Sequence, residues 1–217
     1  IDTDVQDHLL PCQYPAAEKS VHGLETSAFQ HSQGRRQRRL QRIVALSFVS
    51  SPSVVSRETG SELGGARVGE PASGALPAWP AQRVSAPMLG ATSAAINETW
   101  LPDQAVTSGF REGISWRRTD GLLYGVLQLD EADFDAARGS TRLQAASEEA
   151  YRRIFRLLEA ERVPHLWRVW NYLAAINLDI HGLERYRQFN VGRQEAFLKC
   201  HRGATGNVPA ACAIGLA

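Results

Sequence analysis

The chain has 217 residues, of which 43% are hydrophobic and 22% charged, so it can bury a hydrophobic core and form one or two domains. Its 24 basic and 23 acidic side chains leave a net charge of +1, which excludes a strong overall field for nucleic acid or lipid. The longest apolar stretch near the start, residues 43–49, is much shorter than the roughly 20 residues of a membrane-spanning helix. It is typical of a strand.

Residues 1–83 form an N-terminal segment of uneven composition. Gln, Ser, Gly and Pro are frequent, and residues 50–80 contain the many helix- and strand-breaking residues of a long connecting loop. The arginines between Arg35 and Arg42 form a basic run that can contact an anionic polymer, but no aromatic side chain stands among them to stack on bases. We therefore expect a solvated arm, and we place a domain boundary between residues 83 and 84.

Residues 84–217 show a more regular pattern. Residues 113–117 and 122–129 are strand-like and flank Asp120-Gly121, a dipeptide that favours a hairpin. Thr141 and Gln144 stand at the spacing of a helix capping box, and apolar residues then recur with helical period until about Pro164. A third strand is predicted at residues 166–173, a second helix at 183–201 and a last strand from residue 210.

This order of strands and helices predicts an α+β fold, in which helices pack on one face of a mixed β-sheet. The three cysteines and six histidines show neither disulfide nor metal-ligand spacing, so we expect no metal site. Cysteines without such pairing fit a reducing, cytoplasmic environment.

The second predicted helix contains the residue that first points to a function. At about 100° per residue, Tyr186, Asn190 and Arg193 fall on an apolar arc, whereas Arg185 and Gln188 fall on the opposite, water-facing side. Because an unpaired buried guanidinium is unstable, we expect an anion to meet Arg193. That anion is either a carboxylate elsewhere in the fold or the carboxylate of a small ligand, which a planar guanidinium binds with two parallel hydrogen bonds.

Several short motifs of this region resemble those of the chorismatase family, which includes 3-hydroxybenzoate synthases and enzymes that hydrolyse chorismate. They are R-V-W-N-Y at 168–172, I-N at 176–177, E-R-Y-R-Q-F at 184–189 and G-R-x-x-A-F at 192–197. The resemblance extends from about Val84 through N-E-T-W at 97–100, L-Y-G at 123–125 and the final strand at 210–215. It implies a RidA-like (YjgF-like) architecture with a pseudo-trimer gathered into one chain, of which these residues form an incomplete part.

The resemblance also implies an activity and a site. The expected enzyme converts chorismate with release of pyruvate, uses no cofactor, binds no nucleic acid or membrane and is a monomer. Carried over to this sequence, the residues that hold or line the substrate pocket are Arg193, Tyr186, Arg187, Asn190, Ala211, Cys212 and Ala213. The family's catalytic glutamate and a second carboxylate-binding arginine belong to a C-terminal region that we expect beyond Ala217, so we assign no general acid.

Two other functions stay open at this point. The first is a catalytically silent RidA-like module that binds small carboxylates or assembles with other chains. The second is nucleic-acid binding through the basic run at 35–42, which predicts an affinity that falls steeply with salt.

Overall fold

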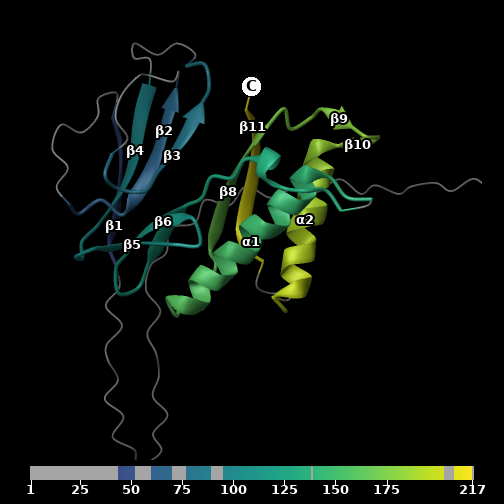
Figure 1. Cartoon of the computed structure of the whole chain (residues 1–217). Coiled ribbons are helices and arrows are strands. Elements are labelled where there is room, and N and C mark those ends of the chain that lie inside the picture. The colour runs from purple at the N-terminus through teal and green to yellow at the C-terminus, as the bar shows by residue number, and fades with distance from the viewer. Residues whose placement is uncertain are drawn as a thin grey trace, which may run out of the picture. The chain divides into compact units, whose positions relative to one another are not determined.

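A computed structural model of the chain describes residues 44–51, 60–69, 77–88, 95–137, 139–202 and 208–216 (Figure 1). All of them belong to one of the two units into which the chain divides, Leu40–Ala217, and we describe this unit by itself. The basic run at 35–42 lies outside the described residues. No helix within the described ranges is long and apolar enough to cross a membrane.

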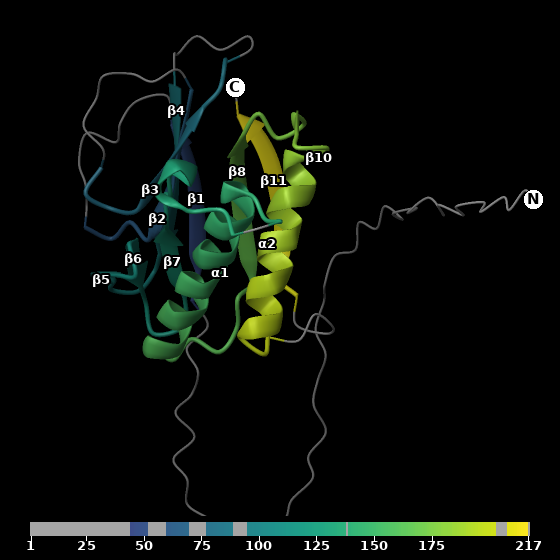
Figure 2. The same ribbon diagram turned by 45° about the vertical axis from the view of Figure 1, so that its right-hand side comes forward.

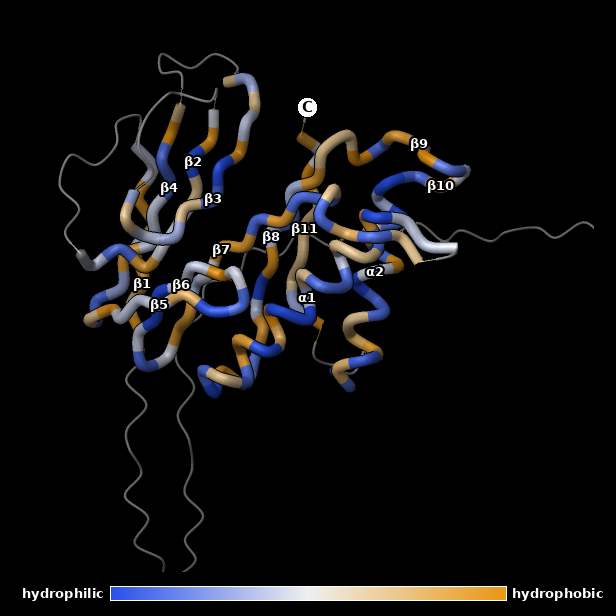
Figure 3. The backbone as a smooth tube through the Cα atoms, in the orientation of Figure 1, coloured by the Kyte–Doolittle hydropathy of each residue, from blue (hydrophilic) through white to orange (hydrophobic). Residues whose placement is uncertain are grey.

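Helix α1 (Arg142–Ala160) begins with the capping box that the sequence predicts. The Thr141 hydroxyl accepts a hydrogen bond from the Gln144 amide at 3.2 Å, and the Gln144 side-chain oxygen accepts one from the Thr141 amide at 2.7 Å. Figure 3 shows hydrophilic and hydrophobic residues recurring along the helix, as an amphipathic helix requires. Its buried residues are Leu143, Ala146, Ser147, Tyr151, Phe155, Leu157 and Leu158.

Helix α2 (Arg185–Lys199) is rotated about its axis relative to the predicted orientation. Its buried residues are Arg185, Gln188, Phe189, Gly192, Ala196 and Phe197. At about 100° per residue, the centre of this face lies about 80° from the centre of the predicted apolar arc. The prediction that Arg185 and Gln188 face water was therefore wrong.

Arg185 is buried because its guanidinium has several acceptors. It forms two hydrogen bonds to the carboxylate of Glu131, one of them 3.1 Å long, from the short 3-10 helix η1 (Glu131–Asp133). The Nε of Arg185 also donates to the Ala174 carbonyl at 3.0 Å. Because the side chain of Arg185 is only 11% exposed, these bonds replace the water that it gives up.

Gln188 is buried for the same reason. Its Nε2 donates to the carbonyls of Ile180, at 2.9 Å, and Leu183, at 2.7 Å. These carbonyls belong to the two-stranded ribbon of β9 (Asp179–Ile180) and β10 (Leu183–Glu184), which precedes α2. The amide side chain thus ties the first turn of α2 to this ribbon.

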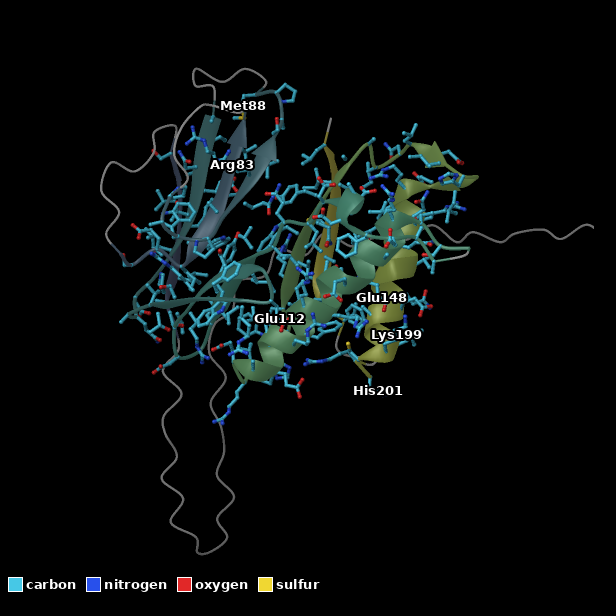
Figure 4. All side chains as sticks on the ribbon, in the orientation of Figure 1. Arg83, Met88, Glu112, Glu148, Lys199 and His201 are labelled. Carbon is cyan, nitrogen blue, oxygen red and sulfur yellow. The ribbon has the colours of Figure 1, made fainter. Side chains whose placement is uncertain are left out.

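The two helices approach each other closely at Gly192. A Cβ added to Gly192 would lie 2.1 Å from the Gln144 carbonyl oxygen and 2.9 Å from the Ser147 Cβ, so any side chain would push α1 away. The Lys199 ammonium donates to both carboxylate oxygens of Glu148, at 2.8 and 2.9 Å (Figure 4). This ion pair joins the helices at the surface.

Strands β8 (Arg168–Ala174) and β11 (Ala210–Leu216) pair in parallel, with α2 between them in sequence. Both helices cover one face of the strand pair (Figure 2). On that face Val169 and Leu173 pack against the helical core. The predicted helix–strand–helix–strand order and the α+β class with helices on one face are confirmed.

A three-stranded antiparallel sheet is formed by β5 (Thr107–Arg111), β6 (Ile114–Arg118) and β7 (Leu123–Val126). Its second connection is the predicted hairpin at Asp120-Gly121. The Thr119 amide donates to the Leu122 carbonyl at 2.8 Å, and the Thr119 hydroxyl accepts from the Leu122 amide at 3.1 Å. The threonine side chain therefore closes the turn.

A second, mixed sheet contains β1 (Leu46–Ser51), β4 (Ala95–Pro102), β2 (Gly64–Gly69) and β3 (Ala81–Ser85), in that spatial order. The strand predicted near residues 43–49 is confirmed from residue 46 onward. The expectation of a continuous loop over residues 50–80 was wrong at β2, whose antiparallel pairing with β4 and parallel pairing with β3 stabilise a glycine-rich strand. The domain boundary at residue 84 stays a prediction.

The side chain of Tyr124 connects the two sheets. Its hydroxyl donates to the Gly65 carbonyl at 2.8 Å, and a Cβ added to Gly64 would lie 2.2 Å from its ring. Tyr124 therefore lies flat against the β2 backbone where side chains are absent.

Candidate functional site

Arg193 lies at the flank of the buried face of α2 and is partly buried. The centre of its guanidinium is 5.7 Å from the ring centroid of Tyr151 and 5.5 Å from that of Phe197, the geometry of a cation–π contact. Its Nε is fully covered and has no hydrogen-bond partner, and Arg193 forms no ion pair with any described residue. The alternative that a carboxylate of the fold pairs with Arg193 is thus not realised among the residues that the structure describes.

A line of polar groups extends from Arg193 toward the strand pair. The Tyr151 hydroxyl donates to the Asn171 side-chain oxygen at 3.1 Å, and the Asn171 amide donates to the Cys212 carbonyl at 2.9 Å. Burial raises the pKa of Tyr151, and the nearby charge of Arg193 and the bond to Asn171 oppose that rise only in part. The phenol therefore stays neutral near neutral pH.

Tyr186 and Asn190 lie on the same side of α2 as Arg193, because residues four and seven apart share a helix side. Tyr186 is 41% exposed and Asn190 is partly buried. Arg187 points elsewhere: its side chain is 74% exposed and lies 3.8 Å from the Glu184 carboxylate. The structure thus groups Tyr186, Asn190 and Arg193, and separates Arg187 from them.

The three β11 residues expected to line the pocket lie beside β8. Ala211, Cys212 and Ala213 are opposite Val169, Trp170 and Asn171 in the parallel register. Because side chains alternate along a strand, Ala211 and Ala213 share the helix-covered face with Asn171, whereas Cys212 shares the opposite face with Trp170. Cys212 is a partly buried free thiol.

The opposite face of the strand pair contains an aromatic group that the sequence did not single out. The Trp170 ring lies 6.4 Å from the Tyr124 ring, and the Arg168 guanidinium lies 5.0 Å from the Trp170 ring centroid. Burial raises the pKa of both Tyr124 and Tyr172, and the Glu98 carboxylate adds to both shifts. The alternation within R-V-W-N-Y was the available signal, since it separates Trp170 and Tyr172 from Asn171.

The arrangement supplies cations and neutral hydrogen-bond donors. No group of three or more His, Cys, Asp or Glu side chains that could hold a metal ion occurs among the described residues. Glu184 and Glu195, two of the glutamates near the family-like motifs, are 36% and 48% exposed and lie near Arg187 and Lys199. The groups around Arg193 are therefore suited to binding a small organic acid, with its carboxylate on Arg193 and hydroxyl groups nearby.

Two clefts lie elsewhere. One of about 540 Å³ is formed where β8 and β11 end, by the loop from Ala175 to Leu178 together with Gly215 and Leu216. The other, of about 490 Å³, lies at the C-terminal ends of the two helices. The carboxyl ends of parallel strands are a common place for ligands, but the first amides of α2 there, those of Arg185 and Tyr186, already donate to loop carbonyls.

The fold and these groups define an α+β protein with a partly buried arginine that has no ion-pair partner among the described residues and lies beside a helix-covered parallel strand pair. Residues 98–217 match the family model described as chorismatase FkbO/Hyg5-like, N-terminal. The chain belongs to this chorismatase family, as its motifs indicated.

Individual relatives agree with this assignment. A chorismatase of Streptomyces hygroscopicus is 39% identical over 103 residues, which cover 47% of this chain and 28% of that protein. A 3-hydroxybenzoate synthase of the same species is 35% identical over 131 residues, 59% of this chain and 35% of that protein. A solved chorismatase crystal structure has a TM-score of 0.60 and 29% identity, and the match covers 80% of this chain and 50% of that one. The chain thus spans about a third of the length of the curated relatives that it matches.

Proposed function

We propose that the protein is a chorismate-converting enzyme that releases pyruvate and forms 3-hydroxybenzoate or a related hydroxylated or dihydroxylated ring acid. The family membership of residues 98–217 supports the substrate class. The observation that carries the proposal is Arg193, a partly buried guanidinium with a covered, unbonded Nε and no carboxylate partner among the described residues. Chorismate has two carboxylates, and in this proposal either one bonds to the terminal nitrogens of the Arg193 guanidinium, because the covered Nε is out of reach of a ligand.

In the proposed complex Arg193 holds one carboxylate through two parallel hydrogen bonds, while Tyr186 and Asn190 donate to its oxygens or to the ring hydroxyl. Arg187 assists only if its exposed side chain swings toward Arg193. Ala211 and Ala213 border the ligand on β11, whereas Cys212, whose side chain lies on the opposite face, borders it only through its backbone. The rings of Tyr151 and Phe197 position the Arg193 guanidinium, and Asn171 holds Tyr151 in place by accepting a hydrogen bond from its hydroxyl.

The reaction needs an acid that protonates the methylene carbon of the enolpyruvyl ether, which creates an oxocarbenium-like centre. Water adds to this centre in hydrolysis, and the resulting hemiketal collapses to pyruvate and a dihydroxylated cyclohexadiene acid. In the 3-hydroxybenzoate branch a neighbouring ring hydroxyl adds instead, and ring aromatisation accompanies loss of pyruvate without net consumption of water. The chemistry needs no cofactor, and we assign the acid to none of the residues of this chain.

We further propose that the enzyme is monomeric, works in the cytoplasm and binds neither nucleic acid nor membrane. The small size of the proposed substrate and the net charge of +1 support the proposal that no nucleic acid or membrane is bound. Gel retardation with DNA and RNA tests the proposed absence of nucleic-acid binding, and light scattering tests the monomeric state.

Activity is tested by a coupled assay for pyruvate release from chorismate, with chromatographic identification of the aromatic product. It is run on the 217-residue chain and on a form extended with the C-terminal region of a Streptomyces relative. We expect the extended form to release pyruvate and the 217-residue chain to release little. If neither form releases pyruvate or binds chorismate, the proposed function is wrong.

The role of Arg193 is tested by Arg193→Lys in the active form. Lysine offers a point charge where a carboxylate is bound by a planar two-pronged donor, so we expect kcat/KM to fall about ten- to a hundredfold. Arg142→Lys, at the exposed start of α1, is the matched control. Normal kcat/KM per folded Arg193→Lys molecule would remove Arg193 from the substrate site.

A further inference from the structure

The cleft at the C-terminal ends of α1 and α2 is separate from the residues around Arg193. Its floor is apolar and is made of Phe155, Leu158, Val163, Pro164 and Cys200. Its volume of about 490 Å³ lies within the range of small-molecule sites.

The rim of this cleft is mainly cationic. Arg156, Arg162 and Arg202 line it, with Glu159 as the carboxylate among the lining residues. Arg156 is held by Glu112, at 2.8 Å, and by Glu149, at 2.9 Å. In contrast, neither Arg162 nor Arg202 forms an ion pair with a described residue, so two positive charges line the cleft without a carboxylate partner in this part of the chain.

Arg202 is oriented by the cleft floor. Its guanidinium lies 5.2 Å from the ring centroid of Phe155, which is buried in the core. A cation–π contact of this kind uses none of the N–H donors of the guanidinium, so they stay free to bind a carboxylate.

Both helices end in a way that brings side chains to this cleft. The residue after each helix end that takes the left-handed conformation is usually glycine, but here it is Arg162 (φ 55°) after α1 and His201 (φ 51°) after α2. The helix-end carbonyls are already occupied by backbone amides, since Val163 donates to Leu158 and Arg202 donates to Phe197. The arginines are therefore not needed to complete the helix ends by hydrogen bonding, and the unusual conformations stand beside a ligand-sized cleft.

We propose that this cleft is a second ligand site, which binds a small organic anion with an apolar body, of the class of an aromatic monocarboxylate. The ring of the ligand lies on the apolar floor, and its carboxylate lies between the guanidinium groups of Arg162 and Arg202. The site does not depend on the proposed reaction at Arg193.

The test uses the isotope-labelled chain and heteronuclear NMR, with sodium benzoate as the probe. Benzyl alcohol supplies the same ring without the charge, and inorganic phosphate supplies charge without the ring. We expect saturable shifts of the Val163, Cys200 and Arg202 amides with benzoate, and much smaller shifts with the other two probes. Equal shifts with benzyl alcohol or phosphate, or benzoate shifts confined to residues around Arg193, would contradict the proposal.

Two variants separate ligand binding from helix capping. Arg202→Gln and Arg162→Gly should each weaken benzoate binding about tenfold, the loss expected for one charge-assisted hydrogen bond. Arg162→Gly should keep or raise thermal stability, because glycine accepts the left-handed conformation. Arg142→Gln, at the other end of α1, should leave benzoate binding unchanged. Unaltered benzoate affinity in a folded Arg162→Gly and in Arg202→Gln would overturn the site.

Discussion

The two helices pack in one layer but encode their orientations differently. α1 buries apolar side chains almost throughout its inner face, whereas α2 buries Arg185, Gln188 and Gly192 beside Phe189, Ala196 and Phe197. In α1 the apolar residues mark the inner face. In α2 the apolar residues mark only one edge of the inner face. The rest of that face is occupied by one glycine and by polar side chains that hydrogen-bond to neighbouring acceptors. Hydrophobic periodicity thus orients a helix reliably only where burial and hydrophobicity coincide.

The largest test of this comparison is Gly192→Val. The valine side chain would overlap the Gln144 carbonyl, so α1 and α2 must separate, and we expect a loss of about 3 kcal/mol in unfolding free energy. Gln194→Val, on the exposed side of α2, carries only the helix-propensity difference of about 0.5 kcal/mol. Urea denaturation of both variants measures the difference; equal stabilities would show that the helices do not touch at Gly192.

The buried polar side of α2 is tested by Arg185→Met. This change leaves the Glu131 carboxylate and the Ala174 carbonyl without their donor, and we expect a loss of about 2 kcal/mol, moderated because Glu131 is 35% exposed. Arg187→Met, two residues along and exposed, should leave stability unchanged. Adding Glu131→Leu to Arg185→Met should restore part of the loss, whereas additive losses would mean that the two side chains do not interact.

The sequence was sufficient for the β6–β7 hairpin, the two helices and the strands β8 and β11 because their signals are local, but it did not predict the β9–β10 ribbon. The Thr141 capping box and the Asp120-Gly121 turn need only neighbours within a few residues. The strand β2 was missed because its stability comes from pairing with β3 and β4, which no local pattern displays. The rotation of α2 was missed because the acceptors of Arg185 lie 11 and 54 residues away along the chain.

Tyr151→Phe tests the polar group within the otherwise apolar face of α1. Losing the hydroxyl leaves the Asn171 oxygen without this donor, and we expect a loss of about 1 kcal/mol, again by urea denaturation. Tyr186→Phe is the control, because the Tyr186 ring is 41% exposed. If the Tyr151→Phe protein is as stable as the parent, the hydrogen bond to Asn171 makes no net contribution to the free energy of unfolding.

The smallest expected effect lies on the outer side of α1, at Glu149. Burial alone would raise its pKa, but hydrogen bonds from Arg153 and Arg156 outweigh burial and lower the pKa below its usual 4.5. A carboxyl with a lowered folded-state pKa stabilises the fold above its usual pKa, and this stability is lost as pH falls through the folded value. Glu149→Gln should therefore lower Tm at about pH 7 and match the parent at about pH 2. Glu159→Gln is the control; a constant difference in Tm at both pH values would contradict the ion-pair explanation.

The candidate site was predictable in part. Helical spacing was enough to group Tyr186, Asn190 and Arg193, and their shared side is confirmed. Tyr151 is 1% exposed and belongs to the core, but its hydroxyl donates to Asn171, which lies 20 residues away along the chain, and helical spacing does not show such a partner. The aromatic group around Trp170 and Tyr124 joins separate sheets, and such a contact appears only once the chain is folded.

The close packing of Tyr124 on Gly64 and Gly65 has a consequence for sequence variation. Any side chain at residue 64 would occupy the space of the Tyr124 ring, so the two positions cannot change independently. A lineage that acquires a larger residue at position 64 must first or simultaneously acquire a smaller one at position 124, and it then loses the hydroxyl that bonds to Gly65. Positions 64 and 124, which lie 60 residues apart along the chain, are therefore expected to covary among related sequences.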